Sequence, residues 1–173
     1  FDACMETAVN AAEIGAHMEM VFNLEHMHPN LTANLIEVVQ AASKQVKIGI
    51  QPGLISDNGA YLAELREAGV SWYCNDLETA PSYFPQICTT HTMKDKIESL
   101  RIARKMGLPI WSGFCLGMGE TQEQRLEAIE TLKELDVQGV ILNFFYDIPG
   151  IGLHGKIKPM SPNEILATIA IIR

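Results

Sequence analysis

The sequence predicts an α/β fold in which parallel strands alternate with covering helices. Short apolar runs alternate with amphipathic segments, and glycines close several of the helical segments. One strand and one helix together take up roughly 25–30 residues, which is typical of parallel strand–helix units. Such units build either about half to two-thirds of an eight-unit barrel or a doubly wound sheet. The pattern alone leaves both arrangements open.

Helices are predicted where apolar residues recur at helical spacing and a capping residue or glycine marks an end. These segments are 2–14, 34–43, 61–67, 92–106, 121–135 and 161–172. Thr92 with Asp95, and Ser161 with Glu164, have the spacing of N-terminal capping pairs. Strands are expected in the apolar runs between the helices, which are residues 17–24, 46–50, 70–74, 108–115 and 137–146.

Composition restricts the class of protein. The chain has 173 residues, 47% of them hydrophobic, which suits one domain with a sizeable core. The net charge of −8 argues against nucleic acid as a partner, and no apolar run is long enough for a membrane span. The chain begins with Phe1 and has no basic leader, so we expect a soluble piece of a longer cytoplasmic protein.

The cysteines and histidines give no metal-binding pattern by spacing alone. No pair of cysteines has zinc-type spacing, and reduced thiols are expected at Cys4, Cys74, Cys88 and Cys115. His26 and His28 could bind a metal only if a third ligand converged, and a surface turn is the favoured explanation. His154 lies in a glycine-rich loop, where we expect it to be solvated. No nucleophile–base pattern stands out at the strand exits.

Ligands of parallel α/β proteins bind at the carboxyl ends of the strands, so the residues that follow each strand are the candidate site. The glycine-rich segment 113–121 would let a flat ligand approach the backbone, although a tight turn followed by a helix cap explains it as well. The segment 73–81 places Asp76 and Glu78 just beyond a strand, where carboxylates suit ribose hydroxyls. A solvated loop is the alternative there.

Three segments in this order resemble the biotin synthase-like radical S-adenosylmethionine (SAM) enzymes. This group includes biotin synthase, a maturase of iron-only hydrogenase and a biosynthetic protein for the iron-guanylylpyridinol cofactor. The segments are residues 73–84 (YCNDLETAPSYF), 88–93 (CTTHTM) and 111–121 (WSGFCLGMGET). The resemblance implies a partial (β/α) TIM-type barrel of the radical SAM type. It also implies that a 4Fe–4S cluster and SAM generate a 5′-deoxyadenosyl radical.

The resemblance also implies roles for individual residues. Glu78 falls where a carboxylate meets the SAM ribose, and Lys96 where a basic residue pairs with the SAM carboxylate. Related biotin synthases have arginine at the position of Lys96. The remaining positions are implied to lie near SAM or the substrate: Gly113, Cys115, Gly117 and Asn143 near adenine, Glu25 near the SAM amino group, and Asp76 and Ser112 beside the substrate.

Two departures from biotin synthase matter. The three closely spaced cysteines that bind the catalytic cluster are absent, so we expect those ligands outside this sequence and the 173-residue chain alone to be inactive. The positions that correspond approximately to ligands of the second, sulfur-donating cluster are Met20, Gly49 and Trp111, none of which can replace a thiolate. Sulfur insertion is therefore not expected.

The leading hypothesis is a radical SAM enzyme of cofactor biosynthesis, with the hydrogenase-cofactor branch as the favoured subtype. Its partners would be a small-molecule substrate and an electron donor such as flavodoxin or ferredoxin. The alternatives are biotin synthase with atypical second-cluster residues, a cluster-free barrel lyase or aldolase, and a non-catalytic scaffold. No lysine ends a predicted strand, which counts against a Schiff-base aldolase.

Overall fold

The computed structural model describes residues 2–16, 18–22, 29–55 and 58–173. Contacts divide the chain into two compact units, Phe1–Asn75 with Glu98–Trp111, and Asp76–Ile97 with Ser112–Arg173. No helix within the described ranges has the length and apolar character needed to cross a membrane. Cys4, Cys74, Cys88 and Cys115 form no disulfide in this structure.

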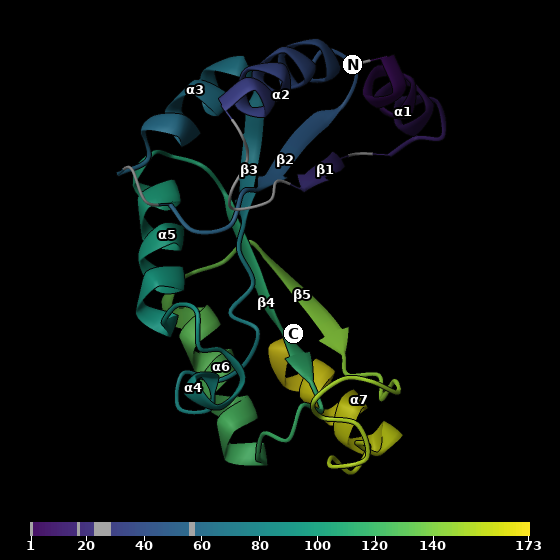
Figure 1. Ribbon diagram of the computed structural model, residues 1–173, viewed down its shortest axis with the longest axis vertical. Helices are drawn as coiled ribbons and strands as arrows, with labels where there is room; N and C mark the ends of the chain where they lie inside the picture. Colours follow the sequence, from purple (N-terminus) through teal and green to yellow (C-terminus); the bar gives the residue numbers. More distant parts are fainter. Residues whose placement is uncertain (1, 17, 23–28, 56–57) are drawn as a thin grey trace. The chain divides into compact units, whose positions relative to one another are not determined.

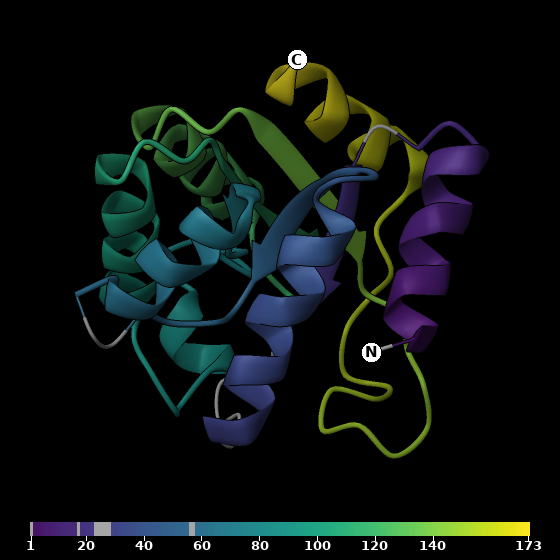
Figure 2. The same ribbon diagram turned by 90° about the horizontal axis from the view of Figure 1, so that it is seen from above.

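The first unit is built around parallel strands. β1 pairs with β2, β2 with β3, and β3 with the beginning of β4, all in parallel. Helices α2 and α3 lie side by side and contact β2 and β3, respectively (Figures 1 and 2). The elements that begin in this unit are α1 (Asp2–Glu13), β1 (Met18–Phe22), α2 (Pro29–Ala42), β2 (Lys47–Gln51), α3 (Ala60–Ala68) and β3 (Val70–Cys74).

The second unit contains most of β4, which has β5 as its neighbour in the sheet. The two strands approach closely at Gly113. A Cβ atom built at this position would overlap the backbone carbonyl of Ile141. Glycine is therefore required at this position for packing. The remaining elements are α4 (Phe84–Ile87), α5 (Met93–Lys105), β4 (Ile110–Leu116), α6 (Gln122–Glu134), β5 (Gly139–Phe144) and α7 (Pro162–Ile172), labelled in Figure 1.

The predicted alternation is confirmed, with two differences. Helix α2 begins at Pro29 rather than at residue 34, since proline is tolerated in the first turn of a helix. The short helix α4 was not predicted, because four residues are too few to show helical periodicity. Both predicted capping pairs are present: Asp95 Oδ2 accepts from Thr92 N at 2.8 Å, and Glu164 Oε2 from Ser161 N at 2.9 Å.

Alternation along β4 separates a buried face from a more open one. Within the second unit, Ser112, Phe114 and Leu116 are at most 1% exposed. Cys115, which lies between Phe114 and Leu116, is only partly buried, whereas Gly113 is buried. Within this unit Cys115 is therefore the β4 side chain that the more open face presents, since Gly113 is buried and its missing Cβ faces the Ile141 backbone.

Gly49 in β2 has no room for a side chain. A Cβ atom there would overlap the indole ring of Trp72, which is 4% exposed. The Trp72 ring is held against Trp111, with ring centroids 5.0 Å apart and a tilt of 41°. This aromatic pair occupies the space next to Gly49 within the first unit.

We expect Gly49→Ala to lower the free energy of unfolding by about 1–3 kcal/mol, because the buried Trp72 ring must move to admit the methyl group. Gly152→Ala is the matched control, since no atom lies within 4 Å of a Cβ built there. The control should be neutral or slightly stabilising. Urea denaturation measures both, and equal stabilities of the two variants would contradict the packing described for Gly49.

Candidate functional site

Glu78 is positioned by backbone contacts with β4. Directly after β3, Leu77 N donates to Gly113 O at 2.8 Å, and Cys115 N donates to Glu78 O at 2.8 Å. Glu78 forms an isolated parallel bridge with Phe114 and has a φ of 68°. A positive φ is unfavourable for a residue with a side chain and is often found at functional sites. The fold thus fixes a carboxylate at the exit of β3, with its side chain 45% exposed.

Lys96 reaches Glu78 from helix α5. Its side chain is 8% exposed, and Nζ lies 3.2 Å from Glu78 Oε1. Nζ also donates to the backbone oxygen of Asp76 at 2.8 Å. The Thr92–Asp95 capping pair starts the helix one turn earlier, which fixes the origin of the long lysine side chain. The structure therefore brings Asp76, Glu78 and Lys96 together, although they are separated in sequence.

Cys115 is a neutral thiol in this setting. Burial raises its pKa, and the negative charges of Glu120 and Glu78 raise it further, to about 11. A protonated thiol behaves as a small hydrophobic side chain. Cys115 can therefore make an apolar contact with adenine, near which the resemblance implies that it lies.

The loop after β4 is closed by Glu120. Its carboxylate accepts hydrogen bonds from Gly117 N and Met118 N, both at 2.8 Å. Tyr83 adds a hydrogen bond from its hydroxyl to Met118 O at 3.0 Å. Helix α6 is capped instead by Thr121, which forms a capping box with Gln124. Glu120 thus stabilises the loop backbone through specific hydrogen bonds, in addition to any effect on the helix dipole.

The other predicted site residues differ in their placement. Asn143 lies exposed on β5, beside the β4 segment that carries Gly113 and Cys115. Asp76 is 7% exposed and lies at the site through its backbone oxygen. Ser112 is fully buried on the face opposite Gly113 and Cys115, so the structure does not bring it to the open face. Glu25 lies outside the described residues.

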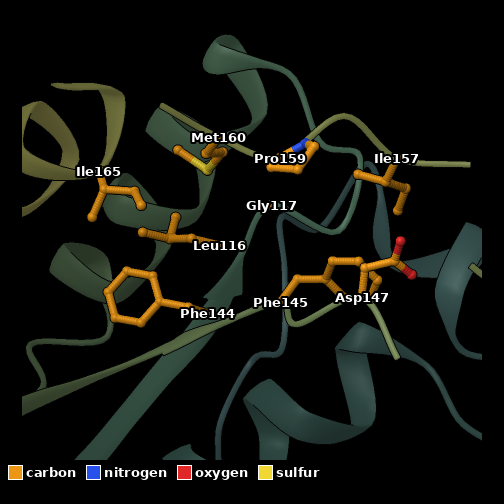
Figure 3. A pocket seen from close by; sticks show the side chains of 9 residues that line it. All are labelled: Leu116, Gly117, Phe144, Phe145, Asp147, Ile157, Pro159, Met160 and Ile165. Atoms are coloured by element: carbon orange, nitrogen blue, oxygen red, sulfur yellow. The ribbon is translucent and has the colours of Figure 1, made fainter. Parts of the chain in front are cut away.

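A small apolar cavity of about 110 Å³ lies beside Gly117. Figure 3 shows Leu116, Phe144, Met160 and Ile165 around it, with the Asp147 carboxylate at one end. Leu116 and Phe144 are the last residues of β4 and β5, and Gly117 and Phe145, which follow them, also line the cavity. The cavity therefore lies at the carboxyl ends of these two strands.

The histidines do not form a metal site in the part of the chain that the structure describes. No group of three or more histidine, cysteine, aspartate or glutamate residues that could hold a metal is found among the described residues. His154 is paired rather than merely solvated, with Nδ1 2.8 Å from Asp147 Oδ1. His26 and His28 fall outside the described ranges.

Two residues that the sequence reasoning missed support the site. Thr79, next to Glu78, has a buried hydroxyl without a hydrogen-bond partner among the described residues, and so offers a further donor. Arg125 on α6 is 8% exposed and lies beside Glu120. The five-residue spacing between Glu120 and Arg125 was the only sequence feature that could have indicated this pair. The burial of Arg125 could not be predicted, because it depends on tertiary packing.

The alternating strands and helices define a barrel-type α/β protein, a class in which ligands bind at the carboxyl ends of the strands. The family model for the Radical SAM superfamily matches residues 26–132. The chain belongs to this superfamily, whose enzymes use SAM and a 4Fe–4S cluster. This confirms the family that the three sequence segments indicated.

Curated relatives place the chain near biotin synthases. Biotin synthase of Geobacter metallireducens is 50% identical over 109 residues, covering 63% of this chain and 33% of the relative. Biotin synthase of Syntrophus aciditrophicus is 41% identical over 156 residues, covering 88% of this chain and 48% of the relative. The chain thus spans about a third to a half of the length of these relatives. The identity to biotin synthases confirms the predicted biotin synthase-like group.

Among solved structures, methylornithine synthase superposes with a TM-score of 0.78 at 22% identity. The match covers 99% of this chain and 52% of that structure. At this identity the likeness concerns the fold, and it supports the partial (β/α) barrel over a doubly wound sheet.

Proposed function

We propose that the whole protein is a radical SAM enzyme in which this chain binds SAM through Glu78 and Lys96. The observation that carries the proposal is the pairing of these two side chains at the exit of β3, at 3.2 Å, with Glu78 in a strained backbone conformation. Both positions coincide with those at which the family resemblance places the ribose and carboxylate contacts of SAM. A carboxylate has two oxygens, so pairing of Oε1 with Lys96 is compatible with accepting a ribose hydroxyl.

The residues present fit SAM chemically. The Lys96 ammonium suits the SAM carboxylate, and Glu78 suits the ribose hydroxyls. The Thr79 hydroxyl supplies a buried donor that lacks a partner among the described residues. Neutral Cys115 gives an apolar contact for adenine, Gly117 allows close approach of the backbone, and Asn143 provides an amide. Gly113, whose missing side chain admits the Ile141 backbone, remains a proposed neighbour of adenine through its own backbone. Asp76 and Ser112 remain proposals for substrate contacts, as Glu25 does for the SAM amino group.

The described residues do not fit a 4Fe–4S cluster. Neither unit brings three cysteines together, since Cys4 and Cys74 belong to the first unit and Cys88 and Cys115 to the second. We therefore propose that residues 1–173 are an internal part of the radical SAM core and that the cluster ligands lie outside them. When bound, the cluster supplies the electron that cleaves SAM, delivered by a flavodoxin or ferredoxin in the cytoplasm.

For the substrate, we propose a small molecule in cofactor biosynthesis, with hydrogenase-cofactor maturation favoured over biotin formation. The reason is the packing at Gly49 and Trp111, two positions that correspond approximately to second-cluster ligands in biotin synthase. The Trp72 ring fills the space beside Gly49 and packs on Trp111, so neither a cysteine nor a cluster fits there without repacking. The names of the relatives support the alternative, biotin synthase with atypical second-cluster residues.

Dethiobiotin distinguishes the two subtypes. The whole protein, reconstituted anaerobically, is incubated with SAM, dithionite and dethiobiotin, with Geobacter metallireducens biotin synthase as the positive control. We expect no biotin from this protein, because Met20, Gly49 and Trp111, at the positions that correspond approximately to the sulfur-donor ligands, carry no thiolate. Biotin formation at a rate similar to that of the control would establish the alternative.

We expect Glu78→Gln in the whole protein to weaken SAM binding by about 1–3 kcal/mol, because it removes a charged acceptor from the ribose hydroxyls. Glu123→Gln is the control, since Glu123 is exposed in the first turn of α6. Isothermal titration of the reconstituted protein with SAM gives both affinities. Unchanged affinity in Glu78→Gln would remove Glu78 from the site.

A further inference from the structure

A cysteine and a histidine meet in the loop between α4 and α5. Cys88 Sγ lies 3.6 Å from His91 Nδ1 and 3.8 Å from Nε2. Thr90 contacts both side chains, with Oγ1 3.5 Å from Cys88 Sγ and 3.0 Å from His91 Nδ1. A thiol beside an imidazole is an arrangement that activates sulfur as a nucleophile. These side chains lie within the second unit and are separate from the predicted SAM ligands.

The loop is anchored at both ends, so the pair is held in place before any ligand arrives. Cys88 N donates to Phe84 O at 3.0 Å and ends α4. The buried Phe84 ring packs against the His91 ring, with centroids 5.5 Å apart and a tilt of 57°. The Thr92–Asp95 capping pair then begins α5. The His91 imidazole therefore packs against the Phe84 ring on one side and contacts the Cys88 thiol on another.

The charges around Cys88 favour its thiolate. Burial raises the pKa of the Cys88 thiol, but hydrogen bonds from Thr90 and from the His91 backbone, with the positive charge of Lys96 on α5, outweigh burial and lower the pKa overall. Cys115 shows the opposite balance, with a pKa of about 11. Cys4 is exposed on α1 and serves as an internal reference thiol.

We propose that Cys88 is a covalent modification site for small disulfides, activated by His91. In the reaction the Cys88 sulfur attacks one sulfur of the disulfide, and a new S–S bond forms as the old one breaks. The other half leaves as a thiolate and takes up the proton that His91 received from the Cys88 thiol. Cys88 is oxidised and the leaving half is reduced, so no further redox partner is needed. This inference does not depend on the proposed function.

The test uses the neutral disulfide dithiodipyridine on the whole protein, with peptide mass mapping to follow Cys88 and Cys4 separately. We expect Cys88 to react at least about threefold faster than Cys4 at pH 7, although it is less exposed, since a larger fraction is thiolate. The ratio of the two rates should fall as the pH rises from about 6 to 8.5, because the contacts that stabilise the Cys88 thiolate increase its rate most at low pH. A ratio that is constant with pH, or a Cys88 slower than Cys4 throughout, would overturn the proposal.

His91→Asn tests the activation itself. We expect the pH midpoint of the Cys88 reaction to move upward in this variant, while the Cys4 profile stays the same. An unchanged Cys88 profile would show that His91 does not activate the thiol. The comparison of Cys88 with Cys4 in the unmodified protein remains decisive if the variant folds poorly.

Discussion

Arg125→Met is expected to lower the free energy of unfolding by about 3–5 kcal/mol, because it leaves a buried carboxylate without its ionic partner. Arg125 Nη1 lies 3.6 Å from Glu120 Oε1, and the two side chains are 10% and 2% exposed. Methionine retains much of the buried volume, so the loss reflects charge more than packing. Glu120 also accepts the two backbone hydrogen bonds that close the loop after β4. Loss of its ionic partner should therefore also disturb Gly117, a predicted neighbour of adenine in this loop.

Glu164→Gln provides the matched control for Arg125. Glu164 Oε1 lies 3.7 Å from Arg125 Nη2, but the glutamate side chain is 52% exposed. Glutamine still completes the capping box with Ser161, so only a solvent-screened ion pair is lost and the free energy of unfolding should change little. Chemical denaturation of both variants gives the comparison. An equal decrease in the free energy of unfolding in the two variants would show that the buried Arg125–Glu120 pair stabilises the protein no more than the exposed Arg125–Glu164 pair.

Lys96→Met should weaken SAM binding about 10- to 150-fold, since a charge-assisted hydrogen bond contributes about 1.5–3 kcal/mol. Lys96 is the basic side chain that the structure holds against Glu78 and the Asp76 carbonyl, at 3.2 and 2.8 Å. Lys96→Arg should retain most of the affinity, because the related biotin synthases use arginine at this position.

Lys94→Met is the control for Lys96, since Lys94 lies exposed two residues earlier on the same helix. Its affinity for SAM should match that of the unmodified protein, and circular dichroism should show that all three variants fold. Equal weakening by Lys94→Met and Lys96→Met would indicate a general charge effect and would contradict a specific contact at Lys96.

The fold was largely predictable from local pattern. The bounds of β3 match the predicted strand 70–74, and both predicted capping pairs form. These features depend on residues close in sequence, such as Thr92 with Asp95 or Ser161 with Glu164. The short helix α4 and the early start of α2 at Pro29 were missed, because periodicity cannot be detected over four residues and proline suggested a turn.

The sequence indicated which residues form the candidate site, but not their backbone conformation, protonation or packing. The motif around Glu78 indicated a carboxylate at a strand exit, but its positive φ depends on a bridge to Phe114, 36 positions further along. The protonated state of Cys115 depends on burial and on the charges of Glu120 and Glu78. Likewise, the Trp72 ring beside Gly49 follows from pairing between β2 and β3. Such effects arise from tertiary contacts that spacing alone does not reveal.

The central claim is that this chain is the SAM-binding part of a radical SAM enzyme, and formation of 5′-deoxyadenosine tests it most directly. The whole protein is reconstituted anaerobically with iron and sulfide, given SAM and dithionite, and compared with its Lys96→Met variant. We predict 5′-deoxyadenosine from the unmodified protein and much less from the variant at subsaturating SAM. A protein that assembles its cluster and yet yields no 5′-deoxyadenosine, or yields the same amount without Lys96, would contradict the account.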